Sequence, residues 1–227
     1  MEQFRVIEVK ESILADNNAD ADALRARLKT QGTFLLNVMS SPGAGKTSVL
    51  KRTVDALKDE FRIGVMEADI DSAVDAEALS QLGVDVIQLH TGGMCHLDAD
   101  MTRQGLTELG VFGGDKSPYD LVFLENVGNL VCPAEFDTGA CRNVMILSVP
   151  EGDDKPLKYP LMFQVSQAVL VNKIDALSLF DFDLERARGR VAGRNEDAAF
   201  FTLSARTGEG FAPWLDWLRS QIKAERG

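Results

Sequence analysis

The sequence has few cysteines and no long apolar run, and each of these absences narrows the class of protein. Three cysteines occur among 227 residues, and this small odd number predicts reduced thiols in a cytoplasmic protein and not a disulfide framework. No apolar run reaches the roughly 18 residues that a membrane span needs, and no basic-then-apolar leader opens the chain. We therefore expect neither a membrane segment nor a secretion signal.

Basic residues are too few for a protein that binds nucleic acid. Lys and Arg number 24 against 35 Asp and Glu, which gives a net charge of −11, whereas binding to a phosphate backbone depends on Lys and Arg. Apolar residues make up 45% and charged residues 26% of the chain, which is ordinary for a globular protein. No repeat, low-complexity tract or linker divides the chain, and its length suits one large α/β domain.

A phosphate-binding loop is the most informative feature present. Residues 40–47 read Ser-Ser-Pro-Gly-Ala-Gly-Lys-Thr directly after the apolar run 34–39, with Ser40 in place of the usual first glycine. A strand followed by such a loop lets backbone N–H groups at a helix N-terminus surround the phosphates of a nucleotide. Lys46 would face the β- and γ-phosphates, and the Thr47 hydroxyl would bind Mg²⁺. The expected nucleotide contacts here are Gly43, Ala44, Gly45, Lys46, Thr47 and Ser48.

A second motif predicts that the base is guanine. Asn172-Lys173-Ile174-Asp175 follows the apolar run 168–171, and the Asp175 carboxylate can accept both N1–H and N2–H₂ of guanine. Adenine presents no such pair of donors, so the discrimination is large. Asn172 would shape the loop, and the stem of Lys173 would lie along the base. Ser204-Ala205-Arg206 follows a later strand, where GTPases place a backbone donor for the guanine O6.

The pattern of the remaining chain predicts alternating strands and helices. We expect strands at 34–39, 62–67, 84–89, 121–125, 144–149, 168–172 and 200–203, and helices near 47–59, 72–82, 97–109, 183–191 and 211–224. Before residue 34, a short strand at 5–9 and a helix from Asn18 to Lys29 are expected. The predicted fold is α/β: a P-loop GTPase domain over 34–227 with a single doubly wound, mostly parallel sheet, and a short helical extension over 1–33 that packs on it.

Two acidic segments are candidates for binding Mg²⁺ and sensing the γ-phosphate. Glu-Ala-Asp-Ile-Asp at 67–71 and Glu-Asn-Val-Gly-Asn at 125–129 each follow a predicted strand, where side chains face the ligand crevice. Asp69 and Glu125 would bind Mg²⁺, Asp71 would assist catalysis or merely cap the next helix, and Gly128 would donate its N–H to the γ-phosphate. Because no glutamine follows Gly128 to orient water, we expect slow hydrolysis.

A thiol and an imidazole stand side by side at Cys95 and His96, and Cys132 lies in the loop after Gly128. Cysteine and histidine together suit Zn, Ni or Cu. The residues alone leave two interpretations open: a metal site shared between two chains, because three ligands fall short, or buried cysteines with a helix-capping histidine.

The chain resembles the hydrogenase nickel-incorporation GTPases of the HypB family over nearly all of residues 34–220. The resemblance lies in Thr-Gly-Gly-Met-Cys-His-Leu-Asp-Ala at 91–99, Glu-Asn-Val-Gly-Asn-Leu-Val-Cys-Pro at 125–133 and Asp-Lys-Pro-Leu-Lys-Tyr-Pro at 154–160, together with the phosphate loop, residues 67–71 and the guanine motif. It implies a GTP-dependent homodimer that binds nickel or zinc through Cys95, His96 and Cys132 and helps deliver nickel to [NiFe]-hydrogenase. Expected partners are a HypA-type nickel chaperone and the hydrogenase large subunit precursor. Lys158 is similar to a family lysine that reaches nucleotide across the dimer.

The sequence departs from the family pattern in its N-terminal region. Residues 1–33 contain no His or Cys, so any nickel role would rest on the GTPase-domain site.

Three rival functions remain. Urease accessory GTPases share the phosphate loop, but they separate Cys from His by a proline, whereas Cys95 and His96 are adjacent. A small-molecule kinase would have no use for a guanine-reading Asp175. An adaptor with a vestigial nucleotide site would not need intact Lys46 and Thr47.

Overall fold

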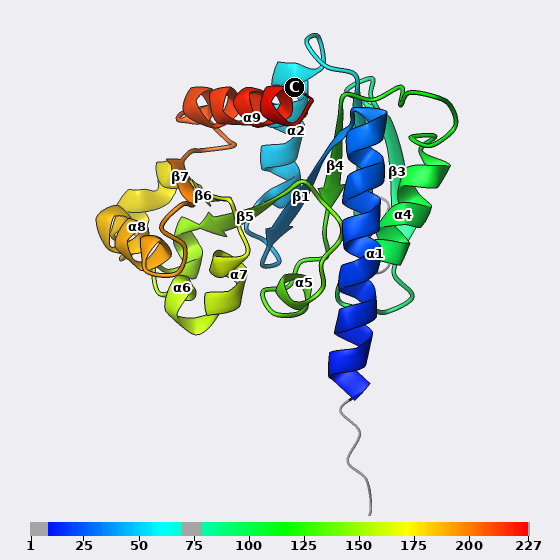
Figure 1. The fold of residues 1–227 in the computed structure, drawn as a ribbon. Helices are drawn as coiled ribbons and strands as arrows, with labels where there is room; N and C mark the ends of the chain where they lie inside the picture. The colour runs from blue at the N-terminus through cyan, green and yellow to red at the C-terminus, as the bar shows by residue number, and fades with distance from the viewer. Residues whose placement is uncertain (1–8, 70–78, 227) are drawn as a thin grey trace, which may run out of the picture.

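The computed structural model describes residues 9–69 and 79–226, which build one parallel sheet with helices on both faces (Figure 1). The sheet has seven strands in the order β3-β2-β4-β1-β5-β6-β7, and every pairing is parallel. The strands are β1 Phe34–Ser40, β2 Ile63–Asp69, β3 Asp85–His90, β4 Leu121–Glu125, β5 Arg142–Ser148, β6 Ala168–Asn172 and β7 Ala199–Thr202. The predicted doubly wound sheet is therefore confirmed.

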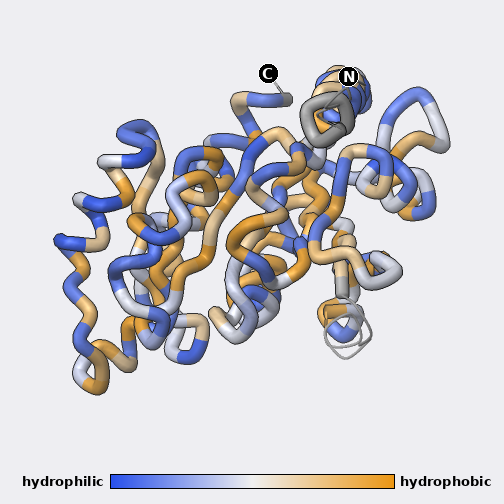
Figure 2. The backbone as a smooth tube through the Cα atoms, turned by 90° about the horizontal axis from the view of Figure 1, so that it is seen from below, coloured by the Kyte–Doolittle hydropathy of each residue, from blue (hydrophilic) through white to orange (hydrophobic). Residues whose placement is uncertain are grey.

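The central strands form where the sequence is mostly apolar. Every residue of β1, β4 and β6 is buried, as expected for a parallel sheet that is covered on both sides. Figure 2 shows hydrophobic stretches of backbone running through the interior between mostly hydrophilic outer segments. The seven predicted strands match the observed ones, with ends that differ by two residues at most.

Helices cover the sheet in two layers. They are α1 Val9–Gln31, α2 Lys46–Leu57, α4 Ala99–Glu108, α5 Cys132–Glu135, α6 Lys155–Lys158, α7 Pro160–Gln164, α8 Leu184–Ala192 and α9 Phe211–Arg226, with 3₁₀ turns η1 Val149–Glu151 and η2 Ile174–Leu179. One face packs against α2 and α9. The other face packs against α1 and α4 beside β2 and β4, and against α7 and α8 beside β5 and β6. None of the described helices is long and apolar enough to cross a membrane.

The N-terminal region differs from the prediction. The helix expected to start at Asn18 begins at Val9, so Asn18 lies inside the helix, exposed to solvent, and does not cap it. Of the strand expected at 5–9, residues 5–8 lie outside the described residues and Val9 is helical. Residues 72–78 of the predicted helix 72–82 also lie outside the described residues. The division into an extension and a domain at residue 33 stays a prediction.

Candidate functional site

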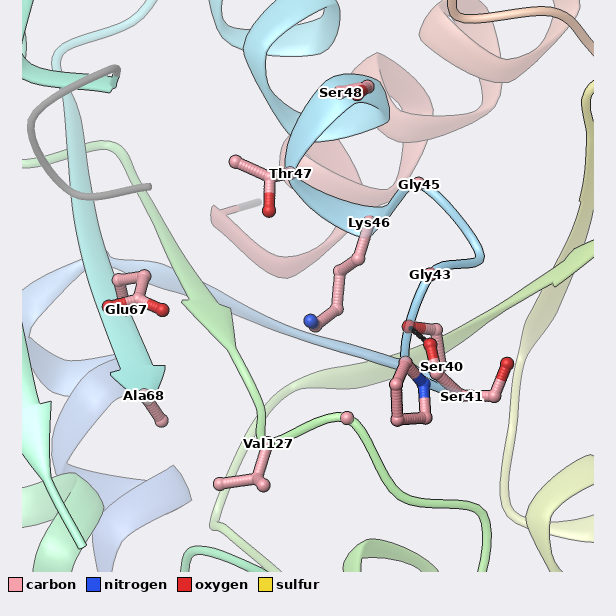
Figure 3. A pocket seen from close by; sticks show the side chains of 12 residues that line it. Ser40, Ser41, Gly43, Gly45, Lys46, Thr47, Ser48, Glu67, Ala68 and Val127 are labelled. Atoms are coloured by element: carbon pink, nitrogen blue, oxygen red, sulfur yellow. Dashed lines mark hydrogen bonds between the residues drawn. The ribbon is translucent and has the colours of Figure 1, made fainter. Parts of the chain in front are cut away.

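A cavity of about 450 Å³ lies at the carboxyl end of β1, where the phosphate loop turns into α2 (Figure 3). Its wall is formed by Ser40, Ser41, Pro42, Gly43, Gly45, Lys46, Thr47, Ser48, Glu67, Ala68, Val127 and Gly128. The N-cap of α2 is Gly45, at φ +91°, which has no side chain to bond the first N–H groups of the helix. A Cβ at Gly45 would lie 2.6 Å from Asn172 Nδ2, so the close approach requires glycine. The helix N-terminus is therefore left open to an anion.

Lys46 and Thr47, which line this cavity, both contact Glu125. The Thr47 hydroxyl donates to Glu125 Oε1 at 2.7 Å, and Lys46 Nζ lies 3.2 Å from the same oxygen. Glu125 is only 1% exposed, and its second oxygen is buried without a hydrogen-bond partner in the described residues. A buried carboxylate beside a hydroxyl, both oxygen donors, fits a Mg²⁺ ion, and Lys46 points into the same space (Figure 3).

Glu67 lines this cavity, whereas the sequence pattern predicted Asp69 and Asp71 of the same segment as the functional residues. Glu67 is 3% exposed and lines the pocket, and the register of β2 with β4 places it directly beside Glu125. Asp69 ends β2, but its side chain, like the whole of Asp71, lies outside the described part of the chain. The signal in the sequence for Glu67 is that the predicted strands 62–67 and 121–125 each end in glutamate.

A second cavity, of about 280 Å³, continues from the first along the phosphate loop. It shares Gly45 and Ser48 with the phosphate pocket and is otherwise lined by Asn172, Lys173, Asp175, Ala176, Ala205 and Arg206. The predicted phosphate and base residues thus form one continuous trough at the carboxyl edge of the sheet. A nucleotide bound along it would place its phosphates at Lys46 and its base at Asp175.

Hydrogen bonds hold the base pocket in shape. Asn172 Nδ2 donates to Ala44 O at 3.0 Å, and Asn172 Oδ1 accepts from Ala205 N at 3.0 Å. Lys173 adopts the left-handed conformation at φ +64°, and its Nζ donates to Gly43 O at 2.6 Å. Asp175 Oδ1 accepts the Ser204 hydroxyl at 2.6 Å. The three predicted segments, 43–48, 172–175 and 204–206, are therefore bonded to one another.

Two residues near the phosphate pocket differ from the prediction. The sequence did not indicate a role for Glu151, and Lys158 lines neither cavity. Glu151 was not predicted, yet it accepts the Ser41 hydroxyl of the phosphate loop as well as the backbone N–H and hydroxyl of Ser148. Its only signal in the sequence is the Ser-x-x-Glu spacing of a capping box. Lys158 is outside the lining of both cavities; its exposed ammonium pairs with Asp154 at 2.5 Å.

Cys95, His96 and Cys132 come together in space. One ligand atom from each of the three lies within 4.8 Å of the others, and the two sulfurs are 2.9 Å apart. The hydrogen bond from Cys95 and burial raise the pKa of the Cys132 thiol, so a metal would displace a proton on binding there. Two thiols and an imidazole form a donor set suited to nickel or zinc.

The surroundings of the His96 imidazole favour metal binding. It stacks on the Phe136 ring with centroids 3.8 Å apart and an interplanar angle of 18°. Burial lowers its pKa, which favours the neutral form that binds metals. Its Nδ1 is buried without a hydrogen-bond partner in the described residues. A buried unpartnered nitrogen beside two thiols fits a metal site. The other interpretation, a helix-capping histidine, is wrong because Asp98 caps α4 by accepting from Met101 N.

The segment that joins β4 to α5 connects the two sites. It starts at Glu125, passes the phosphate pocket at Val127 and Gly128, and ends at Cys132, which lies beside Cys95 and His96. Asn126 is fully buried and donates to Asn37 Oδ1 of β1 at 3.1 Å, while Gly128 passes so near the loop that a Cβ there would be 3.2 Å from Pro42 N. A conformational change at either site can therefore be transmitted to the other through this short segment of the chain.

The fold and the trough define a P-loop nucleotide-binding protein of the α/β class. Comparison with known proteins agrees, because residues 34–202 match the model of the CobW/HypB/UreG nucleotide-binding domain. The hydrogenase maturation factor HypB of Rhizobium leguminosarum bv. viciae is 44% identical over 226 residues, covering 100% of this chain and 73% of that protein. The factor of the same name from Azotobacter vinelandii is 43% identical over 221 residues, covering 97% and 71%.

A solved structure is similar as well. The crystal structure of HypB from Helicobacter pylori in complex with nickel superposes with a TM-score of 0.85 at 35% identity, covering 93% of this chain and 97% of that one. The chain belongs to the HypB family.

Proposed function

We propose that this protein is a GTP-hydrolysing metallochaperone that binds nickel as its cargo and promotes nickel insertion into [NiFe]-hydrogenase during maturation of that enzyme. The observation that carries the proposal is the thiol pair and unpartnered imidazole of Cys95, His96 and Cys132, joined to the phosphate pocket by one short segment. The names of the relatives support the same activity, and the nickel complex of the Helicobacter pylori relative supports the same cargo.

Hydrolysis of GTP would rest on the residues in the trough. Lys46 would stabilise charge that develops on the transferring phosphoryl group, and the open N-terminus of α2 would do the same. Thr47, Glu125 and Asp69 would hold Mg²⁺, with Glu67 close by, and Asp71 would assist. Gly128 would donate to the γ-phosphate. No glutamine follows Gly128, so turnover would be slow, as suits a switch.

Metal binding would require two chains. Cys95, His96 and Cys132 provide three donors in one chain, so a GTP-dependent homodimer that brings two sets together would complete the site for Ni²⁺ or Zn²⁺. In that dimer Lys158, which is exposed in the single chain, would reach the partner's nucleotide. A HypA-type chaperone and the hydrogenase large subunit precursor would be the protein partners, in the cytoplasm.

The activity is tested with purified wild type and Lys46→Ala, assayed for phosphate release from GTP and from ATP with and without Ni²⁺. Wild type should hydrolyse GTP slowly and ATP hardly at all, and Lys46→Ala should lose turnover because the charge facing the transferring phosphate is gone. Circular dichroism should show that the variant is folded.

Near-normal turnover by Lys46→Ala would remove the phosphate-loop assignment. Lys223→Ala is the matched control, because Lys223 is an exposed lysine of α9 that lines neither cavity. This variant should keep wild-type turnover.

A further inference from the structure

We infer that Asn17 of α1 is a positioning residue of the metal site, because its single amide group ties together the two loops that carry the thiols and the imidazole. The inference rests on the proposed function, in which Cys95, His96 and Cys132 bind nickel. It gives the N-terminal helix a direct part in nickel affinity, although that helix contains no metal ligand.

The Asn17 side chain donates one hydrogen bond and accepts another, each with the backbone of a different loop. Its Nδ2 donates to Asp137 O at 3.0 Å, and its Oδ1 accepts from Ala99 N at 3.0 Å. The side chain is 8% exposed, so both backbone groups would lose their partner away from water if the amide were removed. Asparagine is disfavoured inside a helix, and here its side chain serves tertiary structure and not the helix.

The two backbone groups belong to the two halves of the metal site. Ala99 is the first residue of α4 and follows Cys95 and His96 closely along the chain. Between them Leu97 is 1% exposed and packs in the same cluster as Leu24 and Leu28 of α1. The first loop is therefore fixed to α1 by one hydrogen bond and by apolar packing.

The second half is fixed through Asp137. The residue before it, Phe136, is the ring on which His96 stacks at 3.8 Å, and α5 with Cys132 lies just upstream. Since His96 Nδ1 has no hydrogen-bond partner in the described residues, no polar contact at that atom holds the ring. The position of the imidazole depends on Phe136, and the backbone at Phe136 and Asp137 depends on α1.

Arg25, two turns along α1, supports Asp137 in a different way. Its guanidinium donates to both carboxylate oxygens of Asp137 at 2.9 and 2.7 Å and to Ala140 O at 3.3 Å. These contacts hold only the second loop to α1. Asn17 alone bonds to both loops in the described structure, and so its loss should let the two halves of the site move apart.

The test is a Ni²⁺ titration of the full chain in wild type, Asn17→Ala, Asn17→Asp and Asn18→Ala, with Cys95→Ala as the ligand-loss reference. The thiolate-to-nickel charge-transfer absorption reports the ligand set, and GTP affinity is measured on the same proteins before nickel is added. Removal of a residue that orients metal ligands weakens metal binding by about 10- to 100-fold. We expect a loss in that range for Asn17→Ala with a weakened or shifted absorption band, and unchanged GTP affinity.

The other variants separate positioning from general damage. Asn17→Asp keeps an acceptor for Ala99 N but sets an oxygen against Asp137 O, so it should lose nickel affinity too; it also carries the comparison where Asn17→Ala does not fold. Asn18 is exposed on the same helix, and Asn18→Ala should bind nickel like wild type.

Two results would overturn the inference while leaving the metal site intact: wild-type nickel affinity and absorption in both Asn17 variants, or an equal loss in Asn18→Ala. A different result, in which wild type binds nickel no better than Cys95→Ala, would reject the proposed function itself and the inference with it.

Discussion

A neighbouring side chain orients the carboxylate of Asp175, the residue predicted to read the base. Ser204 Oγ donates to its Oδ1 at 2.6 Å, and the nearest cation is Arg206, 3.7 Å from Oδ2 with its own side chain 87% exposed. A surface guanidinium at that distance contributes little. The carboxylate is therefore oriented by the serine within the base pocket.

Replacing Asp175 by Asn should loosen the choice of base. The amide offers one acceptor and one donor, so it meets N1–H and N2–H₂ of guanine poorly and pairs better with xanthine. We expect GTP affinity to fall by about 2–4 kcal/mol, the cost of leaving buried polar groups mispaired, with a gain for xanthosine triphosphate. Direct titration with both nucleotides measures the change. Unchanged GTP affinity would mean that another residue reads the base.

At the residue scale, contiguous motifs were predictable and groups assembled from separate strands were not. Lys46, Thr47 and Asp175 each belong to a short continuous motif whose chemistry is readable in order. Glu67 and Glu151 join the site only because β2 pairs with β4 and because η1 turns back to the phosphate loop. Strand order and loop path depend on the packing of the whole chain, so a local pattern does not contain them.

The same distinction holds at the scale of elements. The long helices α2, α4, α8 and α9 carry an apolar stripe at helical spacing, and the sequence predicted all four. The short helices α5, α6 and α7 have four or five residues each, too few to show a period or to be stable alone. They form because residues such as Pro133, Met162 and Phe163 are buried against the sheet.

The contact of α9 with α2 includes a buried polar pair that supports one prediction. The Trp214 indole N–H donates to Thr53 Oγ1 at 3.0 Å, and Trp214 is 2% exposed. Trp214→Phe removes this bond and leaves a small cavity, so the free energy of unfolding should fall by about 1–3 kcal/mol. Chemical denaturation of the nucleotide-free protein measures it.

Trp217 provides the matched control for that measurement. It stacks on Trp214 with centroids 5.5 Å apart but is only half-buried, so Trp217→Phe should cost clearly less. Equal losses from the two substitutions would show that ring area, and not the buried bond with Thr53, stabilises the contact.

At the scale of the whole molecule, the strand order places the nucleotide and the metal candidate at one edge. β1 carries the phosphate loop and pairs with β4, whose continuation passes Pro42 at Gly128 and ends at Cys132. A γ-phosphate at Gly128 would therefore press on, or order, the segment that holds one of the thiols. Because the path is short and tightly packed, the two ligands are expected to influence each other.

The last prediction is that nickel and GTP bind with positive coupling. GTP that orders residues 125–132 should favour the dimer and so bring two sets of Cys95, His96 and Cys132 together. By thermodynamic linkage, nickel should favour the GTP-bound dimer by the same free energy, about 1–3 kcal/mol. Ni²⁺ titrations of wild type, Cys95→Ala and Cys132→Ala, each with GDP and with a non-hydrolysable GTP analogue, measure the coupling, and sedimentation of the same samples measures the dimer. Wild type should bind nickel about 5- to 150-fold more tightly with the analogue, and both cysteine variants should lose this difference. Equal nickel affinity in all six samples would reject the metal switch and leave a GTPase whose thiols serve packing, since a ligand that binds two states equally shifts neither.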